Sequence, residues 1–152
     1  MKPAPENFPR LSSSITYQDA AKAIEWLCDA FGFELRLKVE GEPGQILHSE
    51  LTYGDGVVMV SQELGESRDR QWKLKMRSPK SLGGACTQTL MLYVDDANAH
   101  CEHARSRGAV IIDEPSTHDY GEGYWADRSY GAQDIEGHMW WITQRLRNPG
   151  TK

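Results

Sequence analysis

Two residues that could move a proton lie two positions apart, at His48 and Glu50. They fall in a stretch whose apolar residues alternate, so we expect a strand that projects both side chains from one face, about 6.6 to 6.8 Å apart along the backbone. An imidazole beside a carboxylate can shuttle a proton or bind a polar group of a substrate. The alternative is an exposed or structurally hydrogen-bonded pair. The sequence therefore offers His48 and Glu50 as candidate catalytic residues and leaves both interpretations open.

The remaining histidines form no convergent cluster. His100 and His103 lie one turn apart on an expected helix, but both flank its buried stripe, which favours solvated side chains. His118 falls in an expected loop, and His138 at an expected turn or strand start. The chain has no Ser-His-Asp elbow, no Walker loop and no GxGxxG motif, so a nucleophilic hydrolase and a nucleotide-binding protein lack support.

The secondary-structure elements around these residues are expected to come in two copies. The pattern Tyr-x-Asp-x-Ala-x-Ala begins at Tyr17 and again at Tyr93, and a glycine follows each copy, at Gly32 and Gly108. This common offset of 76 residues indicates two copies of one supersecondary unit. Two copies are too few for a solenoid, so we expect two modules packed around a shared space.

The first module is expected to have the order βαβββ. Residues 12–17 favour a strand, and Asp19 and Gly32 are typical of the start and end of the helix that follows. Residues 33–40 alternate strictly, which predicts a half-buried strand with all its apolar side chains on one face. Residues 46–53 and 57–62, joined by a tight turn at 54–56, complete the module.

The second module repeats this order with longer loops. We expect a strand at 88–94, a helix capped by Asp95 or Asp96, a strand beginning at 109–112 and a closing strand at 137–143. Residues 113–130 are rich in acidic, aromatic and glycine residues and are expected to hold a loop and the third strand. The acids of 113–136 are opposed only by Arg128. They could rim a cleft for a cationic ligand, but a solvated acidic loop is favoured.

The composition indicates a compact globular protein, with 152 residues, 39% hydrophobic, 26% charged and a formal net charge of -5. No stretch approaches ~20 consecutive apolar residues, and the N-terminus lacks the apolar core of a signal peptide. The three cysteines form neither an even framework nor a CxxC pair, which favours reduced thiols. We therefore expect a cytoplasmic protein without a membrane partner.

Residues 64–87 carry a local excess of positive charge, with six basic against two acidic residues. Trp72 is the only aromatic residue there and no recognition motif accompanies it, so a solvated connector is favoured over a nucleic-acid surface. A loop of this length is also a candidate lid.

The tandem βαβββ order, the helix entries Tyr17-Gln-Asp and Tyr93-Val-Asp-Asp, and the closing Asp134-Ile-Glu-Gly-His-Met-Trp140 resemble the vicinal oxygen chelate superfamily. That superfamily holds glyoxalase I, bleomycin resistance proteins, fosfomycin resistance proteins and extradiol dioxygenases. The resemblance covers about residues 10–145 and implies an α+β fold, a curved, mostly antiparallel eight-stranded sheet with helices on its outer face. It implies a single domain of two modules, 10–63 and 88–145, joined by 64–87. It also implies a homodimer, to which Trp26, Trp72 or Trp125 would contribute.

Metal-dependent members of the superfamily draw ligands from the first and last strand of each module. The resemblance carries these positions to Ser12, Met59, Thr89 and Trp141, with Gln88 as the neighbour if the register slips. Divalent metals in proteins are bound by imidazole, carboxylate or thiolate, and none of the four residues offers one. We therefore expect no metal site and no other cofactor.

In place of a metal site we expect a lining suited to a small molecule. Strand parity turns hydroxyls and large apolar side chains inward, while Leu90, Leu92, Trp140 and Ile142 pack beneath the helices. The alternative is that the large apolar residues only fill the core between the modules. The candidate ligand-binding residues are Ser14, Met59, Thr89, Met91, Tyr93, Trp125 and Trp141.

Two classes of function follow. The favoured one is a metal-free protein, similar to bleomycin resistance proteins, that binds a small molecule between modules or across a dimer. The alternative is a metal-dependent lyase, isomerase or dioxygenase of the glyoxalase I or extradiol dioxygenase kind, whose Lewis acid would lack ligands here. A third hypothesis keeps His48 and Glu50 as a metal-free acid-base pair.

Overall fold

The structure is a computed structural model that describes residues 1–150, apart from the side chains at 67, 68 and 72. Trp72, one of the candidate dimer residues, is therefore outside the described side chains. The chain divides into two compact units, Met1–Ala85 and Cys86–Lys152, and each is described by itself. Among the described residues, no helix is long and apolar enough to cross a membrane.

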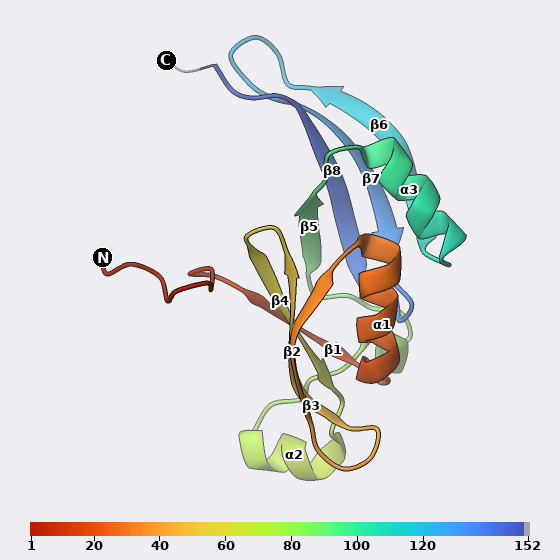
Figure 1. Cartoon of the computed structure of the whole chain (residues 1–152). Helices are drawn as coiled ribbons and strands as arrows, with labels where there is room; N and C mark the ends of the chain where they lie inside the picture. The colour runs from red at the N-terminus through yellow and green to blue at the C-terminus, as the bar shows by residue number, and fades with distance from the viewer. Residues whose placement is uncertain (151–152) are drawn as a thin grey trace. The chain divides into compact units, whose positions relative to one another are not determined.

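The first unit has the predicted order βαβββ, followed by a helix and a helical turn (Figure 1). Its sheet has the strand order β1-β4-β3-β2, in which β1 runs parallel to β4 and the other neighbours are antiparallel. The elements are β1 (Ser13–Tyr17), α1 (Ala20–Phe31), β2 (Glu34–Glu40), β3 (Ile46–Tyr53), β4 (Gly56–Gln62), α2 (Gly65–Trp72) and η1 (Pro79–Leu82).

The second unit repeats the topology of the first. Its sheet has the order β5-β8-β7-β6, with β5 parallel to β8 and the remaining neighbours antiparallel. Figure 1 shows α3 along one face of this sheet, and among the described residues of the unit no helix lies on the other face. The elements are β5 (Thr89–Tyr93), α3 (Ala97–Ser106), β6 (Val110–Asp119), β7 (Ala126–Gln133) and β8 (Met139–Arg147).

Local sequence explains where the two long helices begin. The Asp19 carboxylate accepts a hydrogen bond from the Lys22 amide at 3.0 Å and caps α1, which ends at Gly32 in a left-handed conformation with φ 77°. In α3 the cap is Asp96, whose carboxylate accepts from the amides of residues 98 and 99. The apolar stripes of both helices are buried against their sheets, as predicted.

The choice of Asp96 as the second cap shifts the structural repeat by one residue. Asp19 and Asp96 are 77 residues apart, whereas the Tyr-x-Asp pattern repeats after 76. Tyr17 is consequently 0% exposed in the core, while Tyr93 is 48% exposed on the opposite face of its own sheet. Because strand side chains alternate in direction, one extra residue between strand and cap moves Tyr93 to the other face.

Strand β2 differs from the prediction. Leu35, Leu37 and Val39 were expected on one half-buried face, but each is more than 40% exposed. A β-bulge between Leu35 and Leu37 breaks the alternation, and β2 is an edge strand that pairs only with β3. The strict alternation of the sequence therefore predicted the strand correctly but predicted the burial of its apolar side chains wrongly.

Two loop predictions also need correction. Strand β6 continues to Asp119, so the loop expected from residue 113 is confined to residues 120–125, between β6 and β7. Residues 64–87 hold α2 and η1 rather than an irregular loop throughout. Glu63 fixes this segment to the first sheet, because its carboxylate accepts from the Ser78 amide and, at 2.6 Å, from the Ser81 hydroxyl. The module boundaries 10–63 and 88–145, and their union in a single domain, stay predictions.

Candidate functional site

The open face of the second sheet, the one without α3, is built by strand alternation. Leu90, Leu92, Trp140 and Ile142 turn to the other face and are buried, which confirms the predicted parity. Their neighbours therefore point to the open face. The strand register sets these neighbours in rows across the sheet: Met91 beside Trp141, and Tyr93 beside Thr143.

A pocket of about 720 Å³ lies on this open face, within the 300 to 1,000 Å³ typical of small-molecule sites. Apolar side chains make up much of its wall, with Met91 and Pro149 beside four aromatic rings: Tyr93, Tyr120, Trp125 and Trp141. The remaining lining residues are polar or charged: Asp113, His118, Asp127, Ser129, Thr143 and Arg145. The combination of aromatic surface with a few polar groups is the usual composition of a ligand pocket.

Arg145 organises one wall of the pocket. Its Nε donates to Asp127 Oδ1 at 2.5 Å and its Nη2 donates to the Tyr93 hydroxyl at 2.7 Å. Its guanidinium carbon also lies 5.3 Å from the centroid of the Tyr93 ring. The hydrogen bond to Asp127 raises the pKa of Arg145 above its ordinary value. Residues from β5, β7 and β8 are thus held together, and the Tyr93 ring is fixed in the wall.

The aromatic side of the pocket is supported by the turn between β6 and β7. The rings of Tyr120 and Trp125 have centroids 4.9 Å apart, and the Tyr120 amide donates to the Trp125 carbonyl at 3.1 Å. Arg147 contacts the same turn, since it pairs with Asp119 and donates to the Gly121 carbonyl at 3.0 Å. Arg147 holds the pKa of Asp119 below its usual range.

The structure brings together four of the seven candidate ligand-binding residues. Met91, Tyr93, Trp125 and Trp141 all line the pocket. Thr89 begins β5 and is exposed but is not part of the lining. Ser14 and Met59 are neighbours where β1 pairs with β4, on the face of the first sheet opposite α1, which is the open face of that sheet. A role for any of the seven in binding stays a prediction.

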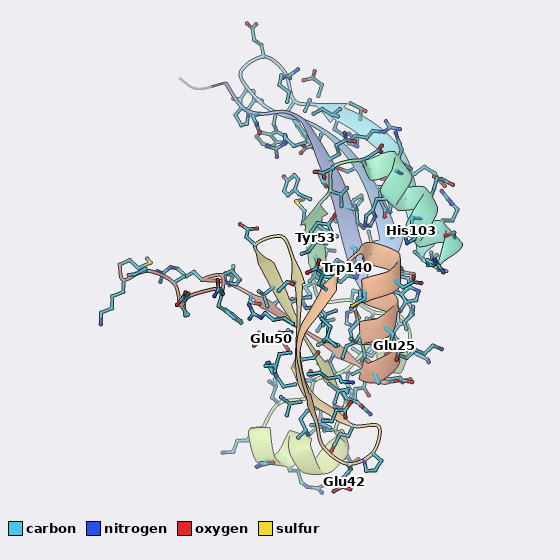
Figure 2. The ribbon with its side chains drawn as sticks, viewed as in Figure 1. Glu25, Glu42, Glu50, Tyr53, His103 and Trp140 are labelled. Carbon is cyan, nitrogen blue, oxygen red and sulfur yellow. The ribbon has the colours of Figure 1, made fainter. Side chains whose placement is uncertain are left out.

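His48 and Glu50 do project from the same face of β3, with His48 Nε2 3.2 Å from Glu50 Oε1 (Figure 2 labels Glu50). A third partner, which the sequence did not indicate, is Arg36, which donates to Glu50 Oε2 through Nε at 2.9 Å and Nη2 at 2.6 Å. Arg36 also donates to the Asn7 carbonyl and lies 5.1 Å from the centroid of the Phe8 ring.

The surroundings of Glu50 bear on its proposed catalytic role. Hydrogen bonds from Arg36 and then His48 lower the pKa of Glu50. A general base works best with a pKa near the operating pH, so this shift moves Glu50 away from that role at neutral pH. The contacts are those of a structural ion pair, and catalysis by His48 and Glu50 stays a prediction.

The residues at the inherited metal positions do not fit a divalent ion. The Ser12 hydroxyl donates to the Val57 carbonyl at 2.5 Å, and Met59, Thr89 and Trp141 offer no imidazole, carboxylate or thiolate. In the sheets, the residue beside Met59 is Ser14 and the residue beside Trp141 is Met91. Replacing Ser12 by Ser14, or Thr89 by Met91, as the assumed metal ligand therefore gives no better ligand. Within the described part of the chain, no group of three or more His, Cys, Asp or Glu side chains could hold a metal ion.

Several site residues were missed or misplaced by sequence analysis. His118 was expected in a loop but lies on β6, hydrogen-bonded to Ser116 at 3.0 Å. His100 was expected to be solvated, but it is half-buried, and its Nδ1 is 2.6 Å from the Tyr130 hydroxyl. Extending the predicted closing strand beyond residue 143 would have found Arg145, because it alternates with Trp141 and Thr143.

The acidic stretch is also not the solvated loop that was favoured. Asp119 and Asp127 pair with arginines of β8, and Glu114 pairs with Arg105 of α3 at 2.7 Å. Asp134 is buried in the turn between β7 and β8, where it accepts from two backbone amides and from the Trp140 ring. The sequence could not show these partners because they come from other strands and from a helix.

Comparison with known proteins decides the family. The sequence profile of the glyoxalase/bleomycin resistance protein/dioxygenase superfamily matches residues 11–142. The chain belongs to this superfamily. The suspected resemblance is thereby confirmed, and so is the fold class, with the eight strands divided between two hydrogen-bonded sheets of four.

The relatives found by sequence are uncharacterised. One protein of Mycobacterium tuberculosis (strain ATCC 25618 / H37Rv) is 29% identical over 139 residues, which are 91% of this chain and 76% of that protein. A protein of Mycobacterium bovis is 29% identical over the same length, covering 91% of this chain and 85% of the relative.

Solved structures share the fold of this chain. TioX from Micromonospora sp. ML1 has a TM-score of 0.67 and 27% identity, over 91% of this chain and 99% of TioX. TnmS3 from Streptomyces sp. CB03234, an antibiotic binding protein, has a TM-score of 0.60 and 18% identity, over 88% of this chain and 93% of TnmS3.

Proposed function

We propose that the protein binds a small molecule with a flat ring system in the pocket on the open face of β5–β8, without the metal site of its superfamily. The observation that carries this proposal is the pocket itself, about 720 Å³ with Tyr93, Tyr120, Trp125 and Trp141 in its lining. An exposed group of large rings is unusual on a protein surface unless it contacts a ligand or a partner. TnmS3, an antibiotic binding protein with the same fold, supports this proposal.

The structure of the wall suits a binding role. Offset or edge contacts with aromatic rings favour flat apolar ligands, and Met91 supplies an adaptable apolar contact beside Trp141. The Arg145 contacts hold Tyr93 in place before a ligand arrives, which reduces the entropy lost on binding. Sequestration requires nothing further, whereas a lyase or dioxygenase would need a Lewis acid for which the donors do not fit.

Calorimetric titration with 2-naphthylmethanol tests the proposal. We expect saturable binding to the wild-type protein and a loss of about tenfold in affinity for Trp141→Ala, because a ring stacked on an aromatic side chain contributes about 1 to 3 kcal/mol. Leu37→Ala is the control, because Leu37 is an exposed apolar residue of β2 that does not line the pocket, and it should bind as the wild type does. Absence of binding, or equal binding by Trp141→Ala, would overturn the proposal.

The metal-dependent alternative has its own measurement. Elemental analysis of protein purified without chelators should find no stoichiometric zinc, iron, manganese or nickel. One tightly bound metal per chain would favour the lyase or dioxygenase alternative instead. Pairing of two copies in solution, expected from the resemblance, stays a prediction that analytical ultracentrifugation can check.

A further inference from the structure

We propose that the pocket selects ligands carrying a protonated amine, and that Asp113 is the carboxylate that recognises it. This inference rests on the proposed function, and it names the chemical class of the ligand. It follows from the charges in the lining, from the position of Asp113 in the sheet, and from the ring opposite it.

The first step is the charge balance of the lining. Two carboxylates, Asp113 and Asp127, face one guanidinium, Arg145. Arg145 donates a hydrogen bond of 2.5 Å to Asp127 and a second hydrogen bond to the Tyr93 hydroxyl, so the charges of Asp127 and Arg145 offset each other. The two carboxylates and the one guanidinium together give a formal charge of -1, and this charge lies on Asp113.

The second step is the isolation of Asp113 from cations of the protein. The other acids of β6 each have an arginine, since Glu114 pairs with Arg105 and Asp119 pairs with Arg147. The Asp113 carboxylate makes no hydrogen bond or ion pair with any side chain or backbone group that the structure describes. Its charge is thus available to a ligand.

Asp113 and Trp141 lie across the sheet from each other, one strand apart. In the sheet, Asp113 pairs with Gly131, and Gly131 pairs with Trp141. Strands are about 4.8 Å apart, so Asp113 and Trp141 stand about 10 Å from each other across a position without a side chain. A Cβ built on Gly131 would lie 2.9 Å from the terminal methyl of Met139, so the floor between the two residues is apolar.

These positions fit a ring that carries an aminomethyl group. The ring of the ligand can lie against the Trp141 indole. Its ammonium group would then point toward Asp113 and remain near the aromatic rings of the lining. Carboxylate attraction and cation–π contacts both favour a cation there, and neither favours a neutral group of the same shape. An anionic ligand would face the unpaired Asp113 charge and would compete with Asp127 and Tyr93 for Arg145.

The test compares three ligands with one ring system: 2-naphthylmethylamine, 2-naphthylmethanol and 2-naphthylacetate, titrated calorimetrically at pH 7.5. We expect the amine to bind roughly tenfold more tightly than the alcohol, from an exposed charge pair plus a cation–π contact, and the acetate to bind least. The preference for the amine should shrink at high salt.

Asp113→Asn is the diagnostic variant, because it removes the charge and keeps the shape. It should remove most of the preference for the amine, leave only the smaller cation–π contribution, and keep the affinity for the alcohol unchanged. Glu114→Gln is the matched control, since Glu114 is the adjacent acid on β6, is paired with Arg105 and does not line the pocket. It should retain the full preference for the amine.

The outcomes separate the inference from the proposed function. Equal binding of amine and alcohol by the wild type, tightest binding of the acetate, or an amine preference that Asp113→Asn leaves undiminished would each overturn the inference and leave the pocket a binding site. Binding of none of the three ligands would overturn the proposed function and the inference with it.

Discussion

The open faces of the two sheets share one backbone plan and carry opposite chemistry. On the first sheet, Glu50 is hydrogen-bonded to both Arg36 and His48, and the Phe8 ring lies against the Arg36 guanidinium. On the second sheet, four aromatic rings line a pocket, and the carboxylate of Asp113 has no partner among the described groups. Topology therefore provides a surface, and the outward residues of each strand decide whether that surface is already filled by its own contacts.

Two neighbouring tryptophans on β8 should differ most in their contribution to stability. Trp140 is 1% exposed and donates to Asp134 at 3.1 Å, whereas Trp141 lines the pocket. Trp140→Ala should lower the free energy of unfolding by about 3 to 5 kcal/mol, as for other large-to-small changes in a core. Trp141→Ala should lower it by about 1 kcal/mol or less. Urea denaturation followed by circular dichroism measures both, and similar losses would show that Trp141 is also core.

A second, smaller effect compares the turns that precede the last strand of each sheet. Asp134 is buried and accepts from the amides of Glu136 and His138 at 3.1 and 3.0 Å. Asp134→Ala leaves these donors unsatisfied and should cost about 1 to 3 kcal/mol. Asp55 lies in the exposed turn between β3 and β4, so Asp55→Ala should change the unfolding free energy by about 0.5 kcal/mol or less. Equal losses of unfolding free energy for Asp134→Ala and Asp55→Ala, measured by urea denaturation, would contradict a structural role for Asp134.

The smallest effect concerns the ion pair on the first open face. Because Arg36 lowers the pKa of Glu50, the folded state gains stability above the ordinary carboxyl range and loses it as pH falls through the lowered pKa. Arg36→Ala should therefore cost at most about 1 kcal/mol at pH 7, and the difference from the wild type should shrink toward pH 3.

Urea midpoints at a series of pH values measure this difference. Lys38→Ala, which breaks the more exposed pair with Glu40, is the control and should show a smaller dependence on pH. A difference between wild type and Arg36→Ala that stayed constant from pH 7 to pH 3 would contradict the assignment.

Sequence analysis predicted the fold well because its signals are local. Capping by Asp19, the apolar stripe of α1 and the alternation of β8 each depend on residues within a few positions of one another. The burial of β2 was wrong because a bulge depends on the partner strand. The partners of the acids of β6 and β7 were missed for the same reason, since Arg145 and Arg147 reach them across the sheet.

The candidate site was predicted in part. Parity along β5 and β8 brought out Met91, Tyr93 and Trp141, because every second residue of a strand shares a face. The sequence showed Asp113 only as one of the seven acidic residues between 113 and 136. Its distinction is the lack of an arginine partner, and that depends on contacts between elements that are distant in the sequence.

The one-residue difference between the two strand-to-cap connections has a consequence for comparing relatives. Tyr17 and Tyr93 match letter for letter, yet one is a core residue and the other faces solvent. Aligning relatives by the aspartate that starts each helix, instead of by the tyrosine, would pair Tyr93 with Thr16 and Tyr17 with Val94. An alignment made on the repeated letters alone would thus compare a core residue of one unit with a pocket residue of the other.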